Sequence, residues 1–580
     1  MKRNQLALLE PHGKVVLDGD TPTGRYSGLD PTKLRGGYYT PEKVASWIAK
    51  WAIRSANETI LEPSCGDGAF LEAAANRLIS LSKGVRNPSW QLIGVEIVGD
   101  EAAKSRERLA RSLGRRGSAV NIIPRDFFSW WSFARHRSMD VVLGNPPFIR
   151  YQSFPAASRE RAMGLMRTLG LKPNRLTNMW VPFIAAAAAA LKPGGRMGMV
   201  VPAEILQVSY ASQLRSFLTD RFQRINIVAC NDLFFACAEQ EVVLLLADSA
   251  VHNPSETNLC RVALTEMDSV GELTESQPIR VLAKSQPKQI RHDSEKWLKY
   301  FLSNREIALM RELRELSDVT TLSTHASVDV GIVTGKNDFF VLSADQVAKY
   351  DVCEYVMPIV GRSAHIRGIR FTEADWAALA AKGDRVHLLN IGMARRLPEA
   401  CAKYIKNAEA AGIHKGYKCS IRSPWYSVPS IWIPDCFFFR QIYDFPRAVL
   451  NRAAATSTDT IHRMKCKGKP ELLAKSLYTS LTAASAEIEG RSYGGGVLEL
   501  EPSEAERLLV PARLVGGLPL DECDRLLRAN RLNMLVAEND KYILRQGIGL
   551  SREDCAILAG IWTKMRDRRS SRRRRAVQLN

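Results

Sequence analysis

The feature that most constrains the fold of this chain is a series of seven short apolar segments between residues 59 and 247. Helical stretches separate most of these segments, which occupy residues 59–62, 91–97, 120–123, 139–143, 196–202, 225–230 and 241–247. Apolar strands that alternate with helices predict an α/β domain with a mostly parallel sheet. Right-handed crossovers place the turn after each parallel strand at one edge of such a sheet, its carboxyl edge. Side chains from these turns are therefore expected to meet there.

A helix is expected just before the first strand. Pro41 fits its first turn, and Thr40 fits its cap. Four apolar residues then follow at the spacing i, i+3, i+4 and i+7, which predicts one buried helix face. They are Val44, Trp47, Ile48 and Trp51.

The chain has 580 residues, which is too long for a single hydrophobic core, so several domains are expected. Residues 1–35 lack periodicity and are expected to form an N-terminal arm. Residues 36–250 contain the α/β pattern. The alternation is lost beyond them, so residues 251–560 are expected to form a separate α+β domain, followed by a basic tail at residues 561–580.

Composition narrows the class of protein. A net charge of +20 indicates a polyanionic partner, most often nucleic acid, although an arginine-rich tail contributes part of it. The longest apolar run, at residues 179–191, is too short for a membrane span, and the first residues lack the apolar stretch of a signal peptide. The 11 cysteines include no C-x-x-C pair, so neither a metal site nor a disulfide framework is predicted. A cytoplasmic protein with reduced thiols is expected.

The first strand runs into the sequence EPSCGDGAF, residues 62–70. Gly66 and Gly68 allow the backbone to approach a ligand closely, and the first amides of the following helix can donate to a carboxylate. The loop lacks the spacing of a phosphate-binding loop. A short loop beside an acid suits a zwitterionic ligand better than a pyrophosphate.

The next three strand ends each carry a group suited to a nucleoside or a base. Glu96 is placed to accept hydrogen bonds from both hydroxyls of a ribose. Asp126 and Phe127 can bind an adenine amino group and flank the face of its ring. The sequence NPPF, residues 145–148, ends the fourth strand, where two prolines cannot continue a strand ladder. Each has a structural explanation alone, but four such groups in order, each at a strand end, indicate a binding site.

Together these residues resemble the S-adenosylmethionine-dependent N6-adenine DNA methyltransferases of the gamma class, found in type II restriction–modification systems. The resemblance is strongest over residues 36–250. It implies a Rossmann-like class I methyltransferase domain, whose seven-stranded sheet has an antiparallel last strand. It also implies S-adenosylmethionine as the methyl donor, double-stranded DNA as the partner and no metal in the reaction.

The resemblance implies a role for each motif. The segment YYTP, residues 38–41, matches a cofactor-binding segment that precedes the glycine loop in this class. Residues 62–70 match the methionine-binding loop, Glu96 the ribose acid, and Asp126 with Phe127 the adenine-binding pair. The implied cofactor-binding residues are Tyr39, Thr40, Pro41, Glu62, Ser64, Cys65, Gly66, Gly68, Glu96, Asp126, Phe127 and Asn145.

NPPF matches the catalytic motif, so Asn145, Pro146, Pro147 and Phe148 are the implied catalytic residues. An exocyclic adenine amine is a poor nucleophile, because its lone pair is delocalised into the ring. The Asn145 side-chain oxygen and the Pro146 carbonyl can accept its two hydrogens and favour a more tetrahedral nitrogen, while the prolines preorganise the loop. Phe148 can stack on the base. The family usually has tyrosine there, and loss of the hydroxyl leaves stacking intact.

A base inside a duplex cannot reach such a site, and the family rotates it out of the stack. The sequence NDLFFACAEQEVVLLL, residues 231–246, matches the motif that supplies a second ring to hold the base. Phe234 is the expected ring by register against the following strand, with Phe235 as the alternative. Core packing explains either phenylalanine equally well.

Three segments in the second half resemble gamma-class enzymes that carry a C-terminal target-recognition domain, at residues 331–340, 457–464 and 489–502. Within them, Lys336, His462 and Arg491 are candidates for contacts with phosphates or base edges. Structural turns with a solvated charge are the alternative.

Other functions share parts of this pattern. Glutamine methyltransferases that act on release factors use the same loop on a planar amide, but they are much shorter and lack a long basic C-terminal domain. An RNA adenine methyltransferase fits the charge equally well. A non-catalytic DNA-binding protein is the remaining class, and complete cofactor and catalytic motifs argue against it.

No nuclease domain is expected. About 35 residues before the YYTP segment are too few to fold as one, and Pro434-Asp435 lacks a following Glu-x-Lys or Asp-x-Lys. The resemblance therefore implies a modification enzyme that acts as a monomer, with a restriction endonuclease that acts separately as a possible partner. No association with a membrane is expected.

Overall fold

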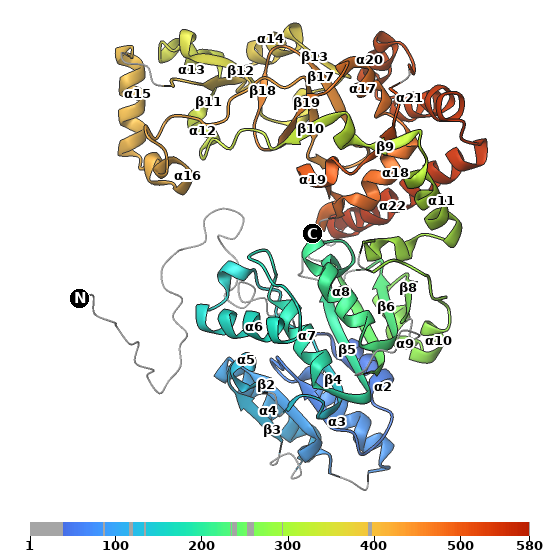
Figure 1. The fold of residues 1–580 in the computed structure, drawn as a ribbon. Helices are drawn as coiled ribbons and strands as arrows, with labels where there is room; N and C mark the ends of the chain where they lie inside the picture. Colours follow the sequence, from blue (N-terminus) through green and yellow to red (C-terminus); the bar gives the residue numbers. More distant parts are fainter. Residues whose placement is uncertain are drawn as a thin grey trace. The chain divides into compact units, whose positions relative to one another are not determined.

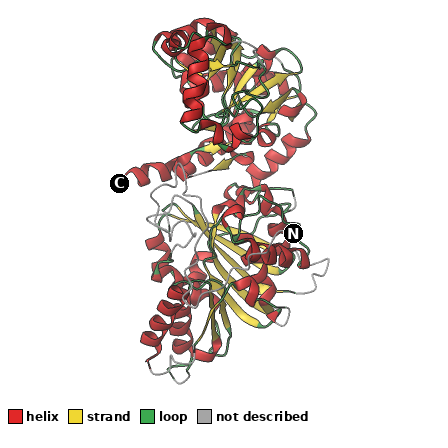
Figure 2. Cartoon of the chain, turned by 90° about the vertical axis from the view of Figure 1, so that its left-hand side faces the viewer, coloured by secondary structure: helices red, strands yellow, loops and turns green. Residues whose placement is uncertain are grey.

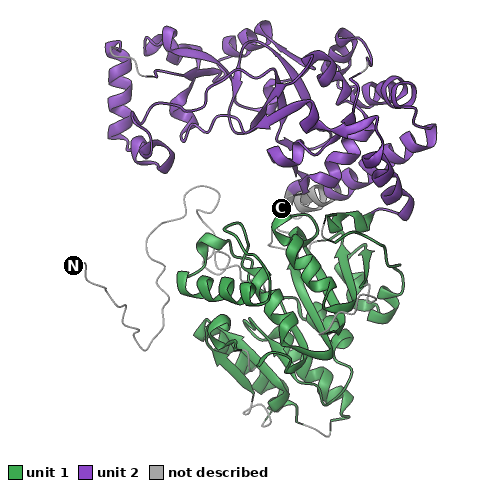
Figure 3. Cartoon of the chain, in the orientation of Figure 1, with its two compact units in different colours: residues 1–301 green, residues 302–580 purple. Residues whose placement is uncertain are grey.

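A computed structural model describes residues 39–578, except for residues 85–86, 115–119, 133–134, 233, 235–240, 252–259, 293, 393–396, 493 and 515. The expected arm at residues 1–35 lies outside the described residues. The chain forms two compact units, unit 1 at Met1–Phe301 and unit 2 at Leu302–Asn580 (Figure 3). Within the described part, no helix combines the length and the apolar character that crossing a membrane requires.

Unit 1 is built on an eight-stranded sheet in the order β3-β2-β1-β4-β5-β7-β6-β8 (Figure 1). Strands β1 to β5 are parallel, and β7 runs antiparallel to its neighbours β5 and β6. The strands are β1 Ile60–Glu62, β2 Leu92–Glu96, β3 Asn121–Pro124, β4 Met139–Gly144, β5 Leu191–Pro202, β6 Phe222–Cys230, β7 Val242–Ala250 and β8 Arg261–Met267. The α/β domain with its reversed strand is thus confirmed.

Helices cover both faces of this sheet (Figures 1 and 2). On one side α3 packs against α2 and α4, and on the other α5, α6, α7 and α8 pack in series. The helices of unit 1 are α2 Glu42–Ala52, α3 Ala69–Leu81, α4 Gly99–Leu113, α5 Phe127–Trp130, α6 Ala156–Thr168, α7 Trp180–Ala190, α8 Ser212–Thr219, α9 Val270–Glu275 and α10 Pro278–Leu282.

The apolar stripe predicted for the first helix is confirmed. Val44, Trp47, Ile48 and Trp51 are all buried in the core of unit 1. The predicted cap was wrong, because Pro41 occupies the N-cap position of α2 and no side chain caps the helix.

Unit 1 extends beyond the boundary expected at residue 250. Strand β8 pairs in parallel with β6 along its whole length and adds an eighth strand that the sequence pattern did not predict. The segment Trp297–Phe301 is also buried within this unit. The compact unit therefore ends at Phe301.

Unit 2 has mixed α+β architecture, as expected. Its largest sheet has the order β10-β19-β15-β17-β13, and a second has the order β11-β14-β12-β18. In two smaller sheets, β21 pairs with β16 and β20, and β22 pairs with β9. The strands are β9 Val319–Thr321, β10 Ala326–Asp329, β11 Val341–Leu342, β12 Val356–Val360, β13 Arg370–Thr372, β14 His387–Leu389, β15 Cys436–Phe439, β16 Gln441–Ile442, β17 Ala448–Arg452, β18 Thr456–Ser457, β19 Ile461–Cys466, β20 Arg491–Ser492, β21 Leu498–Glu499 and β22 Leu509–Pro511.

Helices surround these sheets, and the apolar side chains form two cores. One contains Phe437 and Phe438 of β15, and the other contains Phe340 and Leu388. The helices are α11 Asn304–Glu315, α12 Asn337–Phe340, α13 Ala344–Lys349, α14 Glu373–Ala381, α15 Glu399–Ala410, α16 Tyr417–Ser420, α17 Pro470–Ser476, α18 Ser480–Glu489, α19 Pro502–Ala505, α20 Leu520–Arg528, α21 Leu532–Asn539 and α22 Arg552–Gln578, with a π-helix at Asp540–Ile548.

The expected basic tail at residues 561–580 is largely the continuation of α22. Arg569 on this helix is 2% exposed, and its guanidinium pairs with Glu487 of α18, which is 3% exposed. Its Nη1 also donates to the carbonyl of Gly496 at 2.6 Å. A charge that appeared to belong to a solvated tail is therefore part of the core of unit 2.

Replacing Arg569 with methionine is expected to destabilise unit 2 by about 3–5 kcal/mol, because Glu487 would keep a buried charge without its partner. Urea unfolding and hydrogen exchange of the α18 amides would measure the loss. The double variant Glu487→Gln, Arg569→Met should recover part of it. Arg552→Met, an exposed arginine of the same helix, is the control; equal stability of the two single variants would contradict the prediction.

Candidate active site

The ends of β1 and β4 meet at the carboxyl edge of the sheet. The two strands pair in parallel, with Leu61 opposite Val142. Ser64, just after β1, donates a hydrogen bond from Oγ to the backbone carbonyl of Asn145, just after β4, at 3.3 Å. The glycine loop and the NPPF loop are thus in direct contact.

The end of β2 joins the same site through Glu96. One carboxylate oxygen accepts the amide of Gly66 at 2.9 Å, and the other accepts the amide of Val98 at the same distance. Glu96 is 8% exposed. Burial raises its pKa, and the amide hydrogen bonds oppose that shift. The carboxylate is therefore held in one orientation by the loop it faces.

The two glycines of the loop serve different purposes. Gly66 has φ +49°, and a Cβ atom there would meet nothing within 4 Å, so the space beside the loop is open to a ligand. Gly68 has φ +86°, and its Cβ would lie 2.5 Å from Ser105 Oγ of α4. Glycine at position 68 is therefore needed for both the turn and the packing of α4 against the loop. Cys65, directly before Gly66, is buried, and burial raises the pKa of its thiol.

Glu62 and Thr40 place buried acceptors at this edge. Glu62 is 2% exposed, and its Oε2 has no hydrogen-bond partner among the described residues. Burial, with a smaller contribution from Asp67, raises the pKa of Glu62 well above its ordinary value. Thr40 Oγ1 is also buried and lacks a partner within the described chain. A zwitterionic ligand with an ammonium group would supply the missing donor.

Arg108 on α4 binds three carboxylates around the glycine loop. Its guanidinium contacts Asp67 of the loop at 2.7 Å, Glu72 of α3 at 2.6 Å and Glu42 of α2 at 2.5 Å. The Arg108 side chain is only 15% exposed, so these ion pairs are partly shielded from solvent. One side chain thereby fixes the loop relative to the two helices that flank it.

The end of β3 carries Asp126, which caps α5 by accepting the amide of Ser129 at 3.0 Å. The same oxygen lies 3.4 Å from Arg161 Nη1 of α6. Phe127 is 3% exposed and stacks on Phe183 of α7, with ring centroids 5.3 Å apart. Asp126 and Phe127 thus lie at the end of β3, where they were expected, and the ring of Phe127 packs in an aromatic cluster. Their role in binding adenine stays a prediction.

The NPPF loop itself is partly buried. Pro146 is buried, whereas Asn145, Pro147 and Phe148 are half-buried. Phe148 packs against the core of unit 1. The next residue, Ile149, accepts a hydrogen bond from the amide of Met179 at 3.0 Å, which ties the loop to the start of α7.

The remaining candidate residues in unit 1, Tyr39 and Phe234, show fewer contacts with the glycine loop and the NPPF loop. Tyr39 is 51% exposed, and partial burial, with Glu101 beside its hydroxyl, raises its pKa. Phe234 is 5% exposed and packs within the core of unit 1. Its role in holding a base stays a prediction. Tyr38 and the alternative Phe235 lie outside the described residues.

The candidates in unit 2 differ from one another. His462 is fully buried, and its Nε2 lies 2.7 Å from the carbonyl oxygen of Leu500, so it is a structural residue of β19. Arg491 pairs with the buried Glu504 at 2.7 Å. Lys336 is the exposed member of the three. Asp435 accepts the amide of Cys466, in agreement with a structural role.

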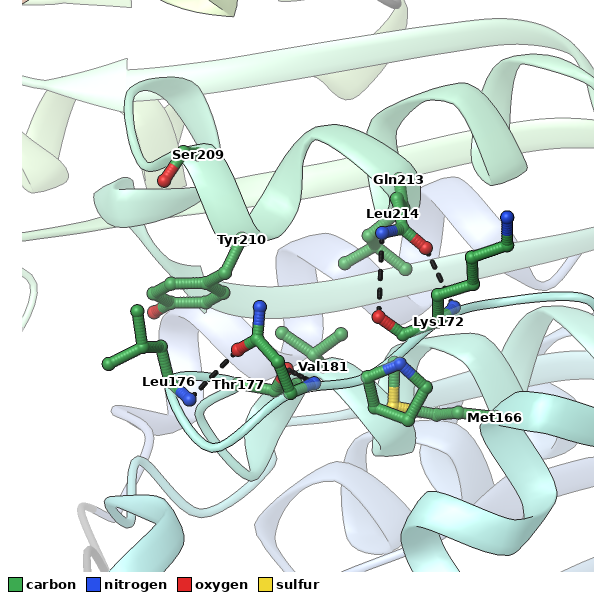
Figure 4. Close-up of a pocket in the computed structure, with 11 residues that line it drawn as sticks. Met166, Lys172, Leu176, Thr177, Val181, Ser209, Tyr210, Gln213 and Leu214 are labelled. Carbon is green, nitrogen blue, oxygen red and sulfur yellow. Dashed lines mark hydrogen bonds between the residues drawn. The ribbon is translucent and has the colours of Figure 1, made fainter. Parts of the chain in front are cut away.

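A pocket of about 170 Å³ lies next to the segment that joins α6 to α7 (Figure 4). Its lining comes from α6, this segment, α7, the short helix Ser209–Ala211 and α8, and includes Lys172, Thr177, Tyr210 and Gln213. Tyr210 donates to Glu204 at 2.6 Å. Within the described residues, no group of three or more His, Cys, Asp or Glu side chains is placed to hold a metal ion.

Two family models match successive parts of this chain. Residues 29–293 match the model of N-6 DNA Methylase. Residues 294–544 match the model of the C-terminal domain of the type II methyltransferase M.Eco57I. The junction between the two matches falls close to the boundary of the compact units at Phe301.

Individual relatives agree with the family models. The chain is 22% identical over 536 residues to the type II methyltransferase M.AccI of Acinetobacter calcoaceticus. The aligned region covers 89% of this chain and 93% of that protein. The chain is also 22% identical over 486 residues to M.XamI of Xanthomonas campestris pv. amaranthicola, covering 82% and 85%. The solved structure of the type IIL restriction–modification enzyme MmeI in complex with DNA has a TM-score of 0.53 at 12% identity, and covers 91% of this chain and 75% of that chain.

The sheet of unit 1, with its reversed strand β7, has the fold of the class I S-adenosylmethionine-dependent methyltransferases. Residues 29–293 are similar to the N-6 DNA methylases, and residues 294–544 are similar to the C-terminal domain of M.Eco57I. The chain is a DNA methyltransferase. The resemblance to the N6-adenine DNA methyltransferases of type II systems is thus confirmed, and S-adenosylmethionine is the methyl donor.

Several residues of the site were not predicted. Arg108 lies in a highly charged helix, so it looked like part of a solvated face, and Arg161 gave no signal either. Phe183 follows a proline within an alanine-rich helix and looked like ordinary core. Ile97, 49% exposed next to Glu96, is an apolar surface at the end of β2; its position directly after the acid was the available signal.

Replacing Arg108 with methionine is expected to weaken S-adenosylmethionine binding about tenfold, which corresponds to about 1.4 kcal/mol. Three carboxylates would lose their shared cation, and the loop would lose its tie to α2 and α3. Titration calorimetry would measure the affinity. Arg108→Lys should recover only part of it, because an ammonium cannot bind three carboxylates as a guanidinium does. Arg111→Met, exposed on the same helix, should bind as the wild type does.

Replacing Glu62 with glutamine is expected to stabilise the free protein while weakening cofactor binding. The raised pKa means that stability is fully present below the ordinary pKa of a glutamate and is lost as the pH rises through the folded-state value. Glutamine carries no charge, so its advantage should appear at pH 8 and vanish at pH 4, with about 2–4 °C in Tm for each kcal/mol. Thermal unfolding across this range would test it, with the exposed Glu107→Gln as the control. A Glu62→Gln variant less stable than wild type at pH 8 would refute the explanation.

Proposed function

We propose that this protein methylates the exocyclic N6 amine of adenine at a specific sequence in double-stranded DNA, as the modification enzyme of a restriction–modification system. The observation that carries the proposal is the hydrogen bond from Ser64 Oγ to the backbone carbonyl of Asn145. It joins the glycine loop to the NPPF loop, so that the methyl donor and the target amine would be bound by adjacent backbone segments.

The residues around the glycine loop would hold S-adenosylmethionine. When bound, it supplies a methyl group already activated by a sulfonium. Glu62 and Thr40 offer buried acceptors for its ammonium, and Glu96 is oriented to accept hydrogen bonds from the ribose hydroxyls. Asp126 would accept a hydrogen bond from the amino group of the cofactor's adenine. Ile97, which is 49% exposed, would supply apolar surface for the adenine ring, and the buried rings of Phe127 and Phe183, which stack on one another, would support it.

The NPPF loop would activate the target amine. The Asn145 side-chain oxygen and the Pro146 carbonyl each accept a hydrogen bond from the amine. These two hydrogen bonds localise the lone pair on the nitrogen and hold the amine in position. The rigid prolines keep both acceptors in place before the base arrives, so little reorganisation accompanies the reaction. Phe148 stacks on the base, and the hydroxyl of the more usual tyrosine is not needed for that contact.

An adenine must leave the duplex to reach these acceptors. Phe148 lies at the site, and Phe234 would contact the base only with a change in its present buried position. Unit 2 would read the DNA sequence, with Lys336 as the exposed member of the predicted contacts. The order of the motifs, with the cofactor loop before NPPF, supports the gamma class. We further propose that the protein acts as a monomer, with its restriction endonuclease as a separate protein.

The proposed activity can be tested in a methylation-free bacterial host that expresses this protein. Modification-sensitive sequencing of the host DNA should find N6-methyladenine at one short motif. Asn145→Ala should abolish it, with a loss of more than about 100-fold, comparable to removal of one oxyanion-hole donor.

The control is Asn121→Ala, an exposed asparagine at the start of β3, which should methylate as the wild type does. An unmodified genome from a well-expressed, folded wild type would refute the DNA substrate, and RNA from the same cells would then be examined. Methylation of cytosine instead would refute adenine specificity alone.

A further inference from the structure

The segment between the NPPF loop and α7 is strongly basic. Residues 150–178, here called the basic segment, contain six arginines and lysines but a single acid, Glu160. Arg159 and Arg161 are occupied, the first over the ring of Tyr151 and the second beside Asp126. Arg167, Lys172 and Arg175 are exposed, and no carboxylate of the described residues forms an ion pair with them. A polyanion is the partner that such a surface fits.

An apolar side chain stands out within this basic segment. Leu176 is 74% exposed, although it is flanked by Arg175 and polar residues. Its backbone is fixed by a tight turn. The amide of Leu176 donates to Asn174 Oδ1 at 2.8 Å, and the amide of Asn174 donates to Thr177 Oγ1 at 3.0 Å. Leu176 is therefore presented to solvent by a rigid turn and not by a loose loop.

The turn is anchored on both sides. The backbone amide and carbonyl of Lys172, before the turn, exchange hydrogen bonds with the side chain of Gln213 on α8 (Figure 4). Met179, after it, donates to the carbonyl of Ile149, the residue next to Phe148. Leu176 thus lies three residues before Met179, which contacts the segment that follows the catalytic loop. This contact is at the carboxyl edge of the sheet, where α7 begins.

An exposed leucine beside basic residues is suited to a protein that rotates a base out of the DNA stack. Removal of one base from the stack leaves an apolar gap between its neighbours, and proteins often insert leucine or similar side chains at such steps. Basic residues beside the wedge then hold the flanking phosphates. A leucine on a rigid basic turn next to the catalytic loop supplies both.

We propose that Leu176 enters the DNA at the target step and occupies the space left by the extruded adenine, while Lys172 and Arg175 contact the neighbouring phosphates. Leu176 is a positioning residue, which shifts the base toward its extruded state without touching the reacting atoms. The inference rests on the proposed function, since it requires a base that leaves a duplex.

The test uses duplexes that carry the motif found by sequencing. Single-turnover methylation gives the rate, and 2-aminopurine at the target position reports extrusion by its fluorescence. Leu176→Ala should methylate the paired duplex about 10–100-fold more slowly and show reduced fluorescence, with unchanged affinity for S-adenosylmethionine. Leu176→Met should retain most of the rate, because it keeps an apolar side chain of similar length.

A duplex with an abasic site opposite the target separates this role from a structural one. Its adenine lacks a pairing partner and leaves the stack more easily, so Leu176→Ala should approach the wild-type rate on it. The control is Ile279→Ala, an 80% exposed residue of α10, which should match the wild type on both duplexes.

The outcomes are distinguishable. A Leu176→Ala variant equal to wild type on the paired duplex, in rate and fluorescence, overturns the inference while wild-type methylation upholds the proposed function. A variant equally slow on both duplexes also overturns it, because its defect would then not concern extrusion. A wild type that methylates neither duplex overturns the proposed function itself.

Discussion

The site depends on one constraint, the parallel pairing of β1 with both β2 and β4. Parallel strands bring their carboxyl ends to one edge, so that segments separated by many residues come within hydrogen-bond distance. Ser64 reaches Asn145 across 81 residues, and Gly66 reaches Glu96 across 30. The site is therefore formed by backbone turns whose positions are set by the sheet.

The electrostatics of this edge favour a ligand over the empty protein. Several carboxylates gather where burial disfavours their charged forms, which raises the pKa of Glu62, Asp67 and Glu96. Amide donors hold Glu96, and Arg108 holds the acids around the loop. Glu62 retains an acceptor without a partner in the described structure. Such an arrangement is unfavourable for folding and favourable for a cation, which is a common relation between stability and function at a binding site.

Strands β1 to β7 of unit 1 could be predicted because each is an apolar segment that ends in a turn, whereas β8 was not predicted. Parallel topology then implied that Glu62, Glu96, Asp126 and Asn145 would converge. The N-cap residue of α2 could not be predicted, because both Thr40 and Pro41 are residue types that commonly start a helix. Arg108 could not be predicted because its partners lie 36, 41 and 66 residues away. In unit 2 the strands are short and pair out of chain order, so local patterns carry little information about its sheets.

The burial of Arg569 against Glu487 also has a consequence for how the protein is made. Glu487 stays without its partner until the ribosome has added a further 82 residues. Unit 1 is complete by Phe301 and can form its core while the rest is still being synthesised. Synthesis therefore finishes the half that performs methyl transfer first. The half proposed to choose the DNA site is finished only when α22 has emerged and placed Arg569 in its core.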